Sequence, residues 1–220
     1  MISRTLLTGL LAGLVASAVL TALYLAKIQP LILQAEVFEH AAAAAGQQEA
    51  APGRALHTLM FNILTGAAFG LMLSAVLTLR GRPVGFRRGL MWGAGGFAAF
   101  ALAPAFGLPP ELPGAGAAPL ALRQVWWLLT VAATASGLWL LMFAGSWPAR
   151  LAGIVLIGCP HVVGAPHPQE SGGAVPAELA AQFVAVSLGT SAVFWGVLGA
   201  ACGYFHDRFG LDQGGATAGA

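Results

Sequence analysis

A short stretch after the first apolar segment carries three side chains that could bind a metal ion. Glu36, Glu39 and His40 stand at positions i, i+3 and i+4, which share one face of a helix. Good helix formers surround them, and Pro30 suits the first turn, so we expect an outer loop helix at about 30–45. Two carboxylates and an imidazole suit a borderline divalent ion such as Co²⁺, Ni²⁺ or Zn²⁺. The same residue types are also common on a solvated helix face.

A second group of candidates follows a proline near the end of another apolar segment. It comprises Cys159, Pro160 and His161, and then His167 and Glu170. A proline late in a helix leaves a backbone carbonyl without its hydrogen bond. Irregular backbone at membrane depth is tolerated where it is buried in protein or lines a wet cavity. His161 is therefore the best single candidate for a pathway residue, although a histidine there could equally hydrogen-bond the helix end.

Two further candidates lie beside short connections. Glu111 is flanked by prolines in the loop 107–114, and prolines restrict the local backbone, so this carboxylate is held in place as a ligand or as an anchor of the loop. His57 opens an apolar segment just after a Pro-Gly pair. The complete set of candidate metal ligands is Glu36, Glu39, His40, His57, Glu111, His161 and His167.

The chain that positions these residues is too apolar for a water-soluble fold. It is 58% hydrophobic and 8% charged, with a mean hydropathy of +0.79, whereas soluble domains carry roughly a quarter charged residues. The apolar stretches are long and continuous, which favours helices over the alternating ~10-residue strands of a transmembrane barrel. We predict an all-α fold, a polytopic transmembrane helical bundle forming one domain over 1–210, with a disordered Gly/Ala tail at 211–220.

Six apolar segments are candidate spans. They lie at 5–27, 58–79, 89–107, 124–146, 149–164 and 181–205. The segment 149–164 would reach only ~24 Å as a helix, and a proline interrupts it, so we predict six spans with five spans plus a re-entrant segment as the alternative. Ala16-Ser17-Ala18 resembles a signal-peptidase site, but the apolar run continues to a full spanning length, which favours a retained first span.

Arginines predict the orientation of the bundle. Arg80, Arg82, Arg87 and Arg88 share one short loop, and Lys and Arg in short loops stay on the cytoplasmic side. Both termini are then expected in the cytoplasm. The opposite, outer face collects most of the acidic and histidine side chains, namely Glu36, Glu39, Glu49, Glu111, Glu170, Glu178, His40, His57, His161 and His167.

Small residues at four-residue spacing predict close helix packing, because lipid supplies no hydrophobic drive for helix association. They are Gly9, Gly13, Ser17 and Thr21, then Gly66, Gly70, Ser74 and Thr78, then Gly199 and Gly203. Asn62 lies on the stripe of Gly66 and is expected to hydrogen-bond a neighbouring helix. Trp126, Trp127 and Trp147 lie next to charged or polar residues and suit the interfacial aromatic belt.

Motifs for other chemistry are missing from the sequence. It contains no Walker A loop, HExxH, paired CxxC or GxSxG, so we predict no enzyme and no tightly bound cofactor. A formal charge of +2 is too small to indicate nucleic acid as a partner. Haem held by two helices has little support, because only His161 lies clearly within an apolar segment.

Several local sequences together resemble one protein family, over nearly the whole length of the chain. They are the N-terminal span, Pro30 through Glu39, Leu108-Pro109-Pro110-Glu111-Leu112-Pro113-Gly114, Arg123-Gln124-Val125-Trp126-Trp127, and Pro160-His161 through Pro166. The chain resembles the CbtA family, probable cobalt transporter A subunits of bacteria, which is usually described with five spans. The resemblance implies cobalt uptake linked to cobalamin supply, with a small one-span partner, CbtB, that bears a His-rich metal-binding segment.

The sequence therefore predicts the membrane subunit of a divalent metal uptake transporter, with Co²⁺ as the transported ion. We expect it in the bacterial inner membrane as a multi-pass protein, with an outer Glu and His cluster collecting the ion and homo-oligomerisation left open. The alternative is a non-catalytic scaffold that anchors a metal-binding partner subunit. In that case the small-residue stripes would be the functional surface.

Overall fold

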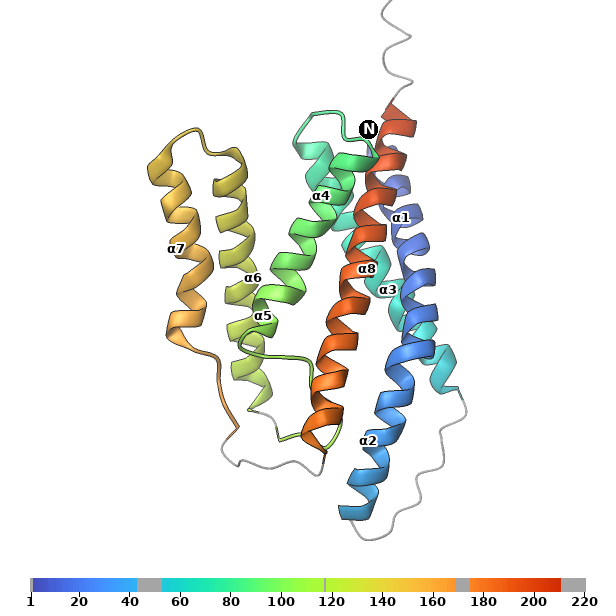
Figure 1. Cartoon of the computed structure of the whole chain (residues 1–220). Helices are drawn as coiled ribbons and strands as arrows, with labels where there is room; N and C mark the ends of the chain where they lie inside the picture. Colours follow the sequence, from blue (N-terminus) through green and yellow to red (C-terminus); the bar gives the residue numbers. More distant parts are fainter. Residues whose placement is uncertain (1, 43–52, 117, 169–174, 211–220) are drawn as a thin grey trace, which may run out of the picture. The chain divides into compact units, whose positions relative to one another are not determined.

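The computed structural model of the protein describes residues 2–42, 53–116, 118–168 and 175–210, apart from the side chains of 39–42 and 54 (Figure 1). Every regular element in these ranges is a helix, which confirms the predicted all-α fold. The elements are α1 (Ile2–Leu23), η1 (Tyr24–Ile28), α2 (Gln29–Ala42), α3 (Arg54–Leu79), α4 (Phe86–Phe97), η2 (Ala98–Leu102), α5 (Ala103–Ala105), α6 (Leu120–Phe143), α7 (Trp147–Val163) and α8 (Ala177–Gly210). The tail 211–220 and Glu170 lie outside the described residues.

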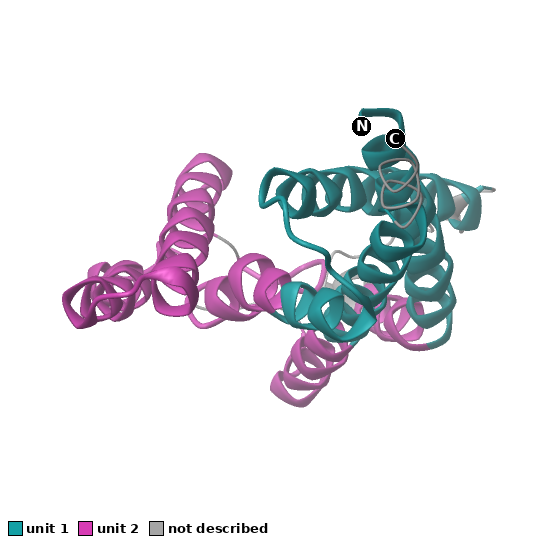
Figure 2. Ribbon diagram, turned by 90° about the horizontal axis from the view of Figure 1, so that it is seen from above, with its two compact units in different colours: residues 1–26, 49–94, 190–220 teal, residues 27–48, 95–189 magenta. Residues whose placement is uncertain are grey.

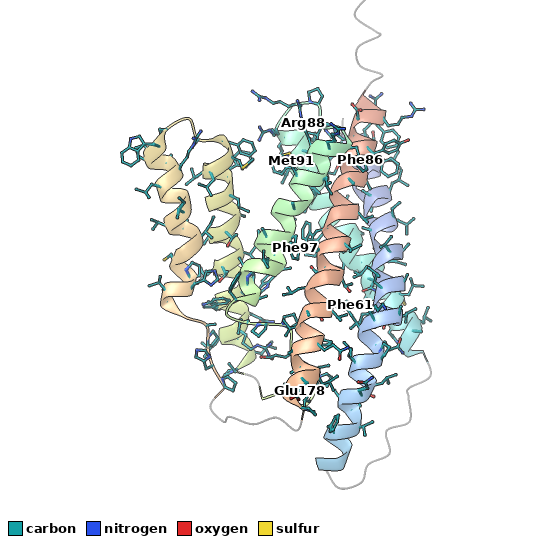
Figure 3. All side chains as sticks on the ribbon, viewed as in Figure 1. Phe61, Phe86, Arg88, Met91, Phe97 and Glu178 are labelled. Carbon is teal, nitrogen blue, oxygen red and sulfur yellow. The ribbon has the colours of Figure 1, made fainter. Side chains whose placement is uncertain are left out.

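Within the described ranges, four helices are long and apolar enough to cross a membrane. They are Ile2–Phe38, Ala55–Leu79, Leu120–Phe143 and Ala177–Gly210, and α7 is a shorter apolar helix. Large apolar side chains are exposed on these helices and on α4, such as Phe61 at 73% and Met91 at 61% (Figure 3). An exterior of this kind is stable in hydrocarbon but not in water. The chain is therefore a multi-pass membrane protein.

Two π-helical stretches each join one α-helix to the next. The first, η1, joins α1 to α2, and the second, η2, joins α4 to α5. Helix α2 covers most of the range in which an outer loop helix is expected, but it follows η1 without a break, so it continues the first span. The predicted segment 89–107 is the consecutive run α4, η2 and α5. A π-turn admits one extra residue into a helix, which lets the chain remain helical through both stretches.

The chain forms two compact units, drawn in different colours in Figure 2. Unit 1 comprises residues 1–26, 49–94 and 190–220, and unit 2 comprises 27–48 and 95–189. Helix α8 contributes to both units, and η1 contains the first boundary between them.

Unit 1 is built on close contacts between backbones. Helices α1 and α3 pack so tightly that a Cβ atom on Gly9 would lie 2.8 Å from the Gly70 carbonyl oxygen. The Ser17 hydroxyl lies 2.7 Å from the carbonyl oxygens of both Gly13 and Asn62 and shares its one hydrogen between them. The Asn62 amide donates to the Thr21 hydroxyl at 3.1 Å, which confirms the hydrogen bond expected of Asn62.

A second glycine contact joins α4 to α8 within the same unit. A Cβ atom on Gly203 would lie 2.6 Å from the Gly85 carbonyl oxygen, and Gly89 faces Gly199 along the same contact. Phe69 from α3 packs on Trp195, which is 2% exposed, at a ring distance of 4.9 Å. The predicted stripes of small residues thus mark where these helices meet.

In unit 2, α7 runs back along α6. Pro148 stands in the first turn of α7, and Gly164, with φ +86°, ends it. A Cβ atom on Gly153 would lie 2.7 Å from the Gly137 carbonyl oxygen, and farther along His161 reaches Trp126 near the start of α6. The end of α7 therefore lies at the start of α6, away from the turn that joins the two helices. This favours a helix that crosses the membrane over a re-entrant segment.

Candidate functional site

A cavity of about 640 Å³ lies in unit 2, between α5, η2, α6 and α7 and the segment that follows α7. Four of the residues around it carry polar groups: His161, His167, Trp126 and Thr134. The rest of its lining consists of apolar residues and glycines. The two histidines expected to bind metal near Pro160 thus share one cavity.

His161 is held in place by the end of α7 and by two aromatic rings. It follows Pro160, whose carbonyl accepts a hydrogen bond from the Gly164 N–H at 3.0 Å. Its ring makes edge contacts with Phe106 and Trp126, with centroid distances of 6.0 and 5.9 Å. The ring of Trp126, which is 7% exposed, is the firmer of the two contacts, because Phe106 is itself 79% exposed.

Two polar atoms beside the cavity lack a hydrogen-bond partner among the described residues. They are the Trp126 Nε1 and the Thr134 Oγ1, in residues that are 7% and 3% exposed. Thr130 lies one turn after Trp126, and its hydroxyl is satisfied by donating to the Trp126 carbonyl at 2.9 Å. Buried polar groups are almost always paired, so the two unpaired ones require an explanation.

Trp126 was expected in the interfacial belt, but its side chain is buried. The loop that begins at Gly107 covers its ring, and a Cβ atom on Gly107 would lie 2.5 Å from the Trp126 Cη2. Trp147, by contrast, is 74% exposed, as an interfacial side chain would be.

Glu111 forms an ion pair with Arg123, the two charged groups lying 2.8 Å apart. Both side chains are about a quarter exposed. Arg123 belongs to the first turns of α6, so the pair fastens the proline-rich loop to this helix. The carboxylate already has a cationic neighbour, and a metal ion would have to compete with it.

None of the other candidate ligands is among the residues that line the cavity. Glu36 is on α2, and the side chains of Glu39 and His40 lie outside the described part of the chain. His57 is exposed in the first turn of α3 in unit 1, with its Nδ1 3.0 Å from the Gly53 carbonyl oxygen. Among the described residues, no three His, Cys, Asp or Glu side chains form a group that could hold a metal.

Comparison with known protein families identifies the family of the chain. The sequence matches the family described as "Probable cobalt transporter subunit (CbtA)" over residues 2–207. The chain belongs to the CbtA family. It is a membrane subunit of a cobalt transport system, with Co²⁺ as the transported ion and with partner subunits implied. No curated protein and no solved structure matches the chain.

In this CbtA family member, sequence reasoning found the two histidines of the cavity but missed Thr134. A signal was available, because Trp126, Thr130 and Thr134 recur at four-residue spacing and so share one face of α6. Gly107 was also missed as a contact residue. Its role depends on the path of the loop back over α6, which no local pattern encodes.

Proposed function

We propose that this CbtA family member is the subunit through which Co²⁺ enters the cell, and that the cavity of unit 2 binds the ion. The observation that supports the site is the presence of His161 and His167 on one cavity of about 640 Å³. Neutral imidazole is a good ligand for late first-row divalent ions. The imidazole of His161 packs against the buried ring of Trp126 and also contacts Phe106.

Acidic residues and histidines of the outer face would bring the ion to this cavity. Glu36, Glu39 and His40 belong to α2, which continues the first span, and His57 opens the second. Clustered negative charge raises the local concentration of cations and speeds their association. Once bound, a divalent ion moving inward gains about 4.6 kcal/mol per 100 mV of membrane potential, twice the single-charge value. No nucleotide hydrolysis is needed for such a step.

The proposal also places the protein in the bacterial inner membrane with its N-terminus in the cytoplasm. One end of unit 1 supports this, because it gathers two arginines from separate segments beside the end of α8. Arg4 donates to the Phe209 carbonyl at 3.0 Å, and Arg82 lies at the same cavity as these two residues. Positive residues near span ends are retained in the cytoplasm, so this end of unit 1 would face inward.

Uptake of radioactive cobalt by cells that express the chain with its partner subunit tests the site. Replacing His161 and His167 together by alanine should lower uptake at limiting Co²⁺ by about tenfold or more, because loss of metal-site groups typically costs 10–100-fold in affinity. His206→Ala is the matched control, since this histidine lies in unit 1 and should leave uptake unchanged. Equal uptake by the double variant and the unaltered chain, at equal expression, would remove the site.

The scaffold alternative predicts a different result. Its functional surface would be the stripes of small residues, yet Gly9, Gly13, Gly66 and Gly70 contact one another between α1 and α3. Those faces are already occupied within the chain. A scaffold would also keep full cobalt uptake without His161 and His167, so the same measurement separates the two functions.

A further inference from the structure

We propose that the cavity of unit 2 is filled with water and admits the hydrated cation as far as Thr134. This inference rests on the proposed function for the identity of the ion, but the presence of water is independent of it. It assigns roles to Trp126 and Thr134 as residues that bind water or the outer hydration shell.

The unpaired atoms are the first reason. Trp126 is 7% exposed and Thr134 is 3% exposed, and neither the indole N–H nor the hydroxyl has a partner among the described residues. Leaving a buried donor or acceptor unpaired costs more free energy than a typical hydrogen bond contributes. Both residues border the cavity. The two atoms are themselves closed off, so each needs a small side-chain movement to meet water there.

The depth of the cavity is the second reason. Its lining begins at His167 and Gly164, beyond the end of α7, and continues to Thr134 and Leu138. Thr134 lies near the middle of α6 (Leu120–Phe143). In a span of this length the middle of the helix is far from both membrane surfaces. A polar group at that depth needs a protein partner or a water-filled cavity, and the described residues supply no protein partner.

The volume of the cavity is large enough for a hydrated ion. Water occupies about 30 Å³ per molecule, so an octahedral ion with six waters takes up about 180 Å³. The cavity of about 640 Å³ is more than three times that size. The volume would therefore accommodate an ion that still carries its hydration shell.

The polar groups differ in what they can offer such an ion. Water bound to a cation donates its hydrogens outward, and the Thr134 hydroxyl and an imidazole nitrogen can accept them. The Trp126 indole can only donate, so it would bind the oxygen of a water outside the first hydration shell. The histidines can also replace waters directly, whereas Thr134 acts through the water.

Accessibility of a cysteine at position 134 tests whether water reaches this depth. Cys159 and Cys202 are first replaced by alanine, and Thr134→Cys is treated with a small, membrane-impermeant cationic methanethiosulfonate. The thiolate is the reactive form and requires water, so Thr134→Cys should react at least about tenfold faster than the control Ala135→Cys. Ala135 lies at the same depth on α6 but is exposed on the outer surface of the helix.

The outcomes test separately whether water fills the cavity and whether the ion enters it. Rapid labelling of Thr134→Cys that Co²⁺ slows supports the proposal in full. Labelling that Co²⁺ does not affect overturns the role in the ion path, and no labelling in a folded variant overturns the water-filled cavity itself. Failure of the proposed function would show differently, as unchanged cobalt uptake in the His161 and His167 double variant.

A second variant keeps the test decisive if cysteine disturbs the helix. Thr134→Val removes the hydroxyl while conserving the shape, and Thr134→Ser retains the hydroxyl. If water binds there, Thr134→Val should slow cobalt uptake without raising the melting temperature, and Thr134→Ser should not slow uptake. A higher melting temperature for Thr134→Val would show that the hydroxyl is truly unpaired and the cavity dry.

Discussion

The ion pair between Glu111 and Arg123 is one of two features that hold the proline-rich loop. The two charged groups are 2.8 Å apart and about a quarter exposed, so solvent screens part of their attraction. Exposed pairs of this kind contribute about 0.2–1 kcal/mol. The pair therefore anchors the loop weakly, and the prolines supply the remaining rigidity.

A double-mutant cycle distinguishes an anchor from a metal ligand. For an anchor, Glu111→Gln and Arg123→Gln should each lower the free energy of unfolding, with a coupling of about 0.5 kcal/mol. The two variants should then affect cobalt uptake equally. Loss of uptake in Glu111→Gln but not in Arg123→Gln would instead identify Glu111 as a ligand.

The helices of unit 1 approach one another so closely because glycines stand where they cross. A Cβ atom on Gly9 would meet backbone atoms of Gly70 and Leu71 at 2.8 Å. Backbone cannot move aside as a flexible side chain can. Not every glycine has this role, and a Cβ atom on Gly95 of α4 would meet nothing within 4 Å.

Gly9→Ala and Gly95→Ala form a matched pair of helical substitutions. Gly9→Ala should lower the free energy of unfolding in detergent by about 1–3 kcal/mol, because α1 and α3 must separate. Gly95→Ala should raise it by up to about 1 kcal/mol, because alanine favours the helix. Changes of the same sign and size in both variants would contradict the packing described for α1 and α3.

Within each unit, the positions of the helix ends bear on how often the chain crosses the membrane. In unit 1, the start of α1 and the end of α8 meet near the connection between α3 and α4, where Arg88 donates to the Pro83 carbonyl at 3.1 Å (Figure 3). In unit 2, α7 returns along α6 to the level of Trp126. Both features favour an even number of crossings with the termini on one side.

Labelling of introduced cysteines from the two sides tests this topology. In a chain without Cys159 and Cys202, Pro168→Cys should react with an impermeant maleimide on intact cells. Gly145→Cys, in the turn between α6 and α7, should react only after permeabilisation. Reaction of both positions from the same side would establish the re-entrant alternative. His167 would then lie on the other side of the membrane from Glu36, Glu39 and His40.

Much of the fold could be predicted from the sequence, because the signals are local. Long apolar runs indicated membrane helices, and the spacing of Gly9, Gly13, Gly66 and Gly70 indicated where helices touch. Asn62 was predicted to bond another helix and does so through Thr21. The division of 89–107 by η2 was not predictable, since a π-turn leaves no marker in these apolar residues.

The candidate site was only partly predictable. Pro160 and His161 drew attention because a proline late in a span has a direct physical consequence. Trp126 was expected at the membrane interface, whereas the loop at Gly107 buries it. Its surroundings depend on residues about 20 and 35 positions away in the sequence, and no periodicity connects them.

The sequence by itself determined the class of the protein, because the burial of apolar residues in lipid depends on composition and segment length. It also determined which faces of the helices contact one another, because only small residues permit such close approach. The tertiary structure alone decided which polar groups share the cavity. His161, His167, Trp126 and Thr134 come from different helices and a loop, and only the packing of α7 against α6 brings them together.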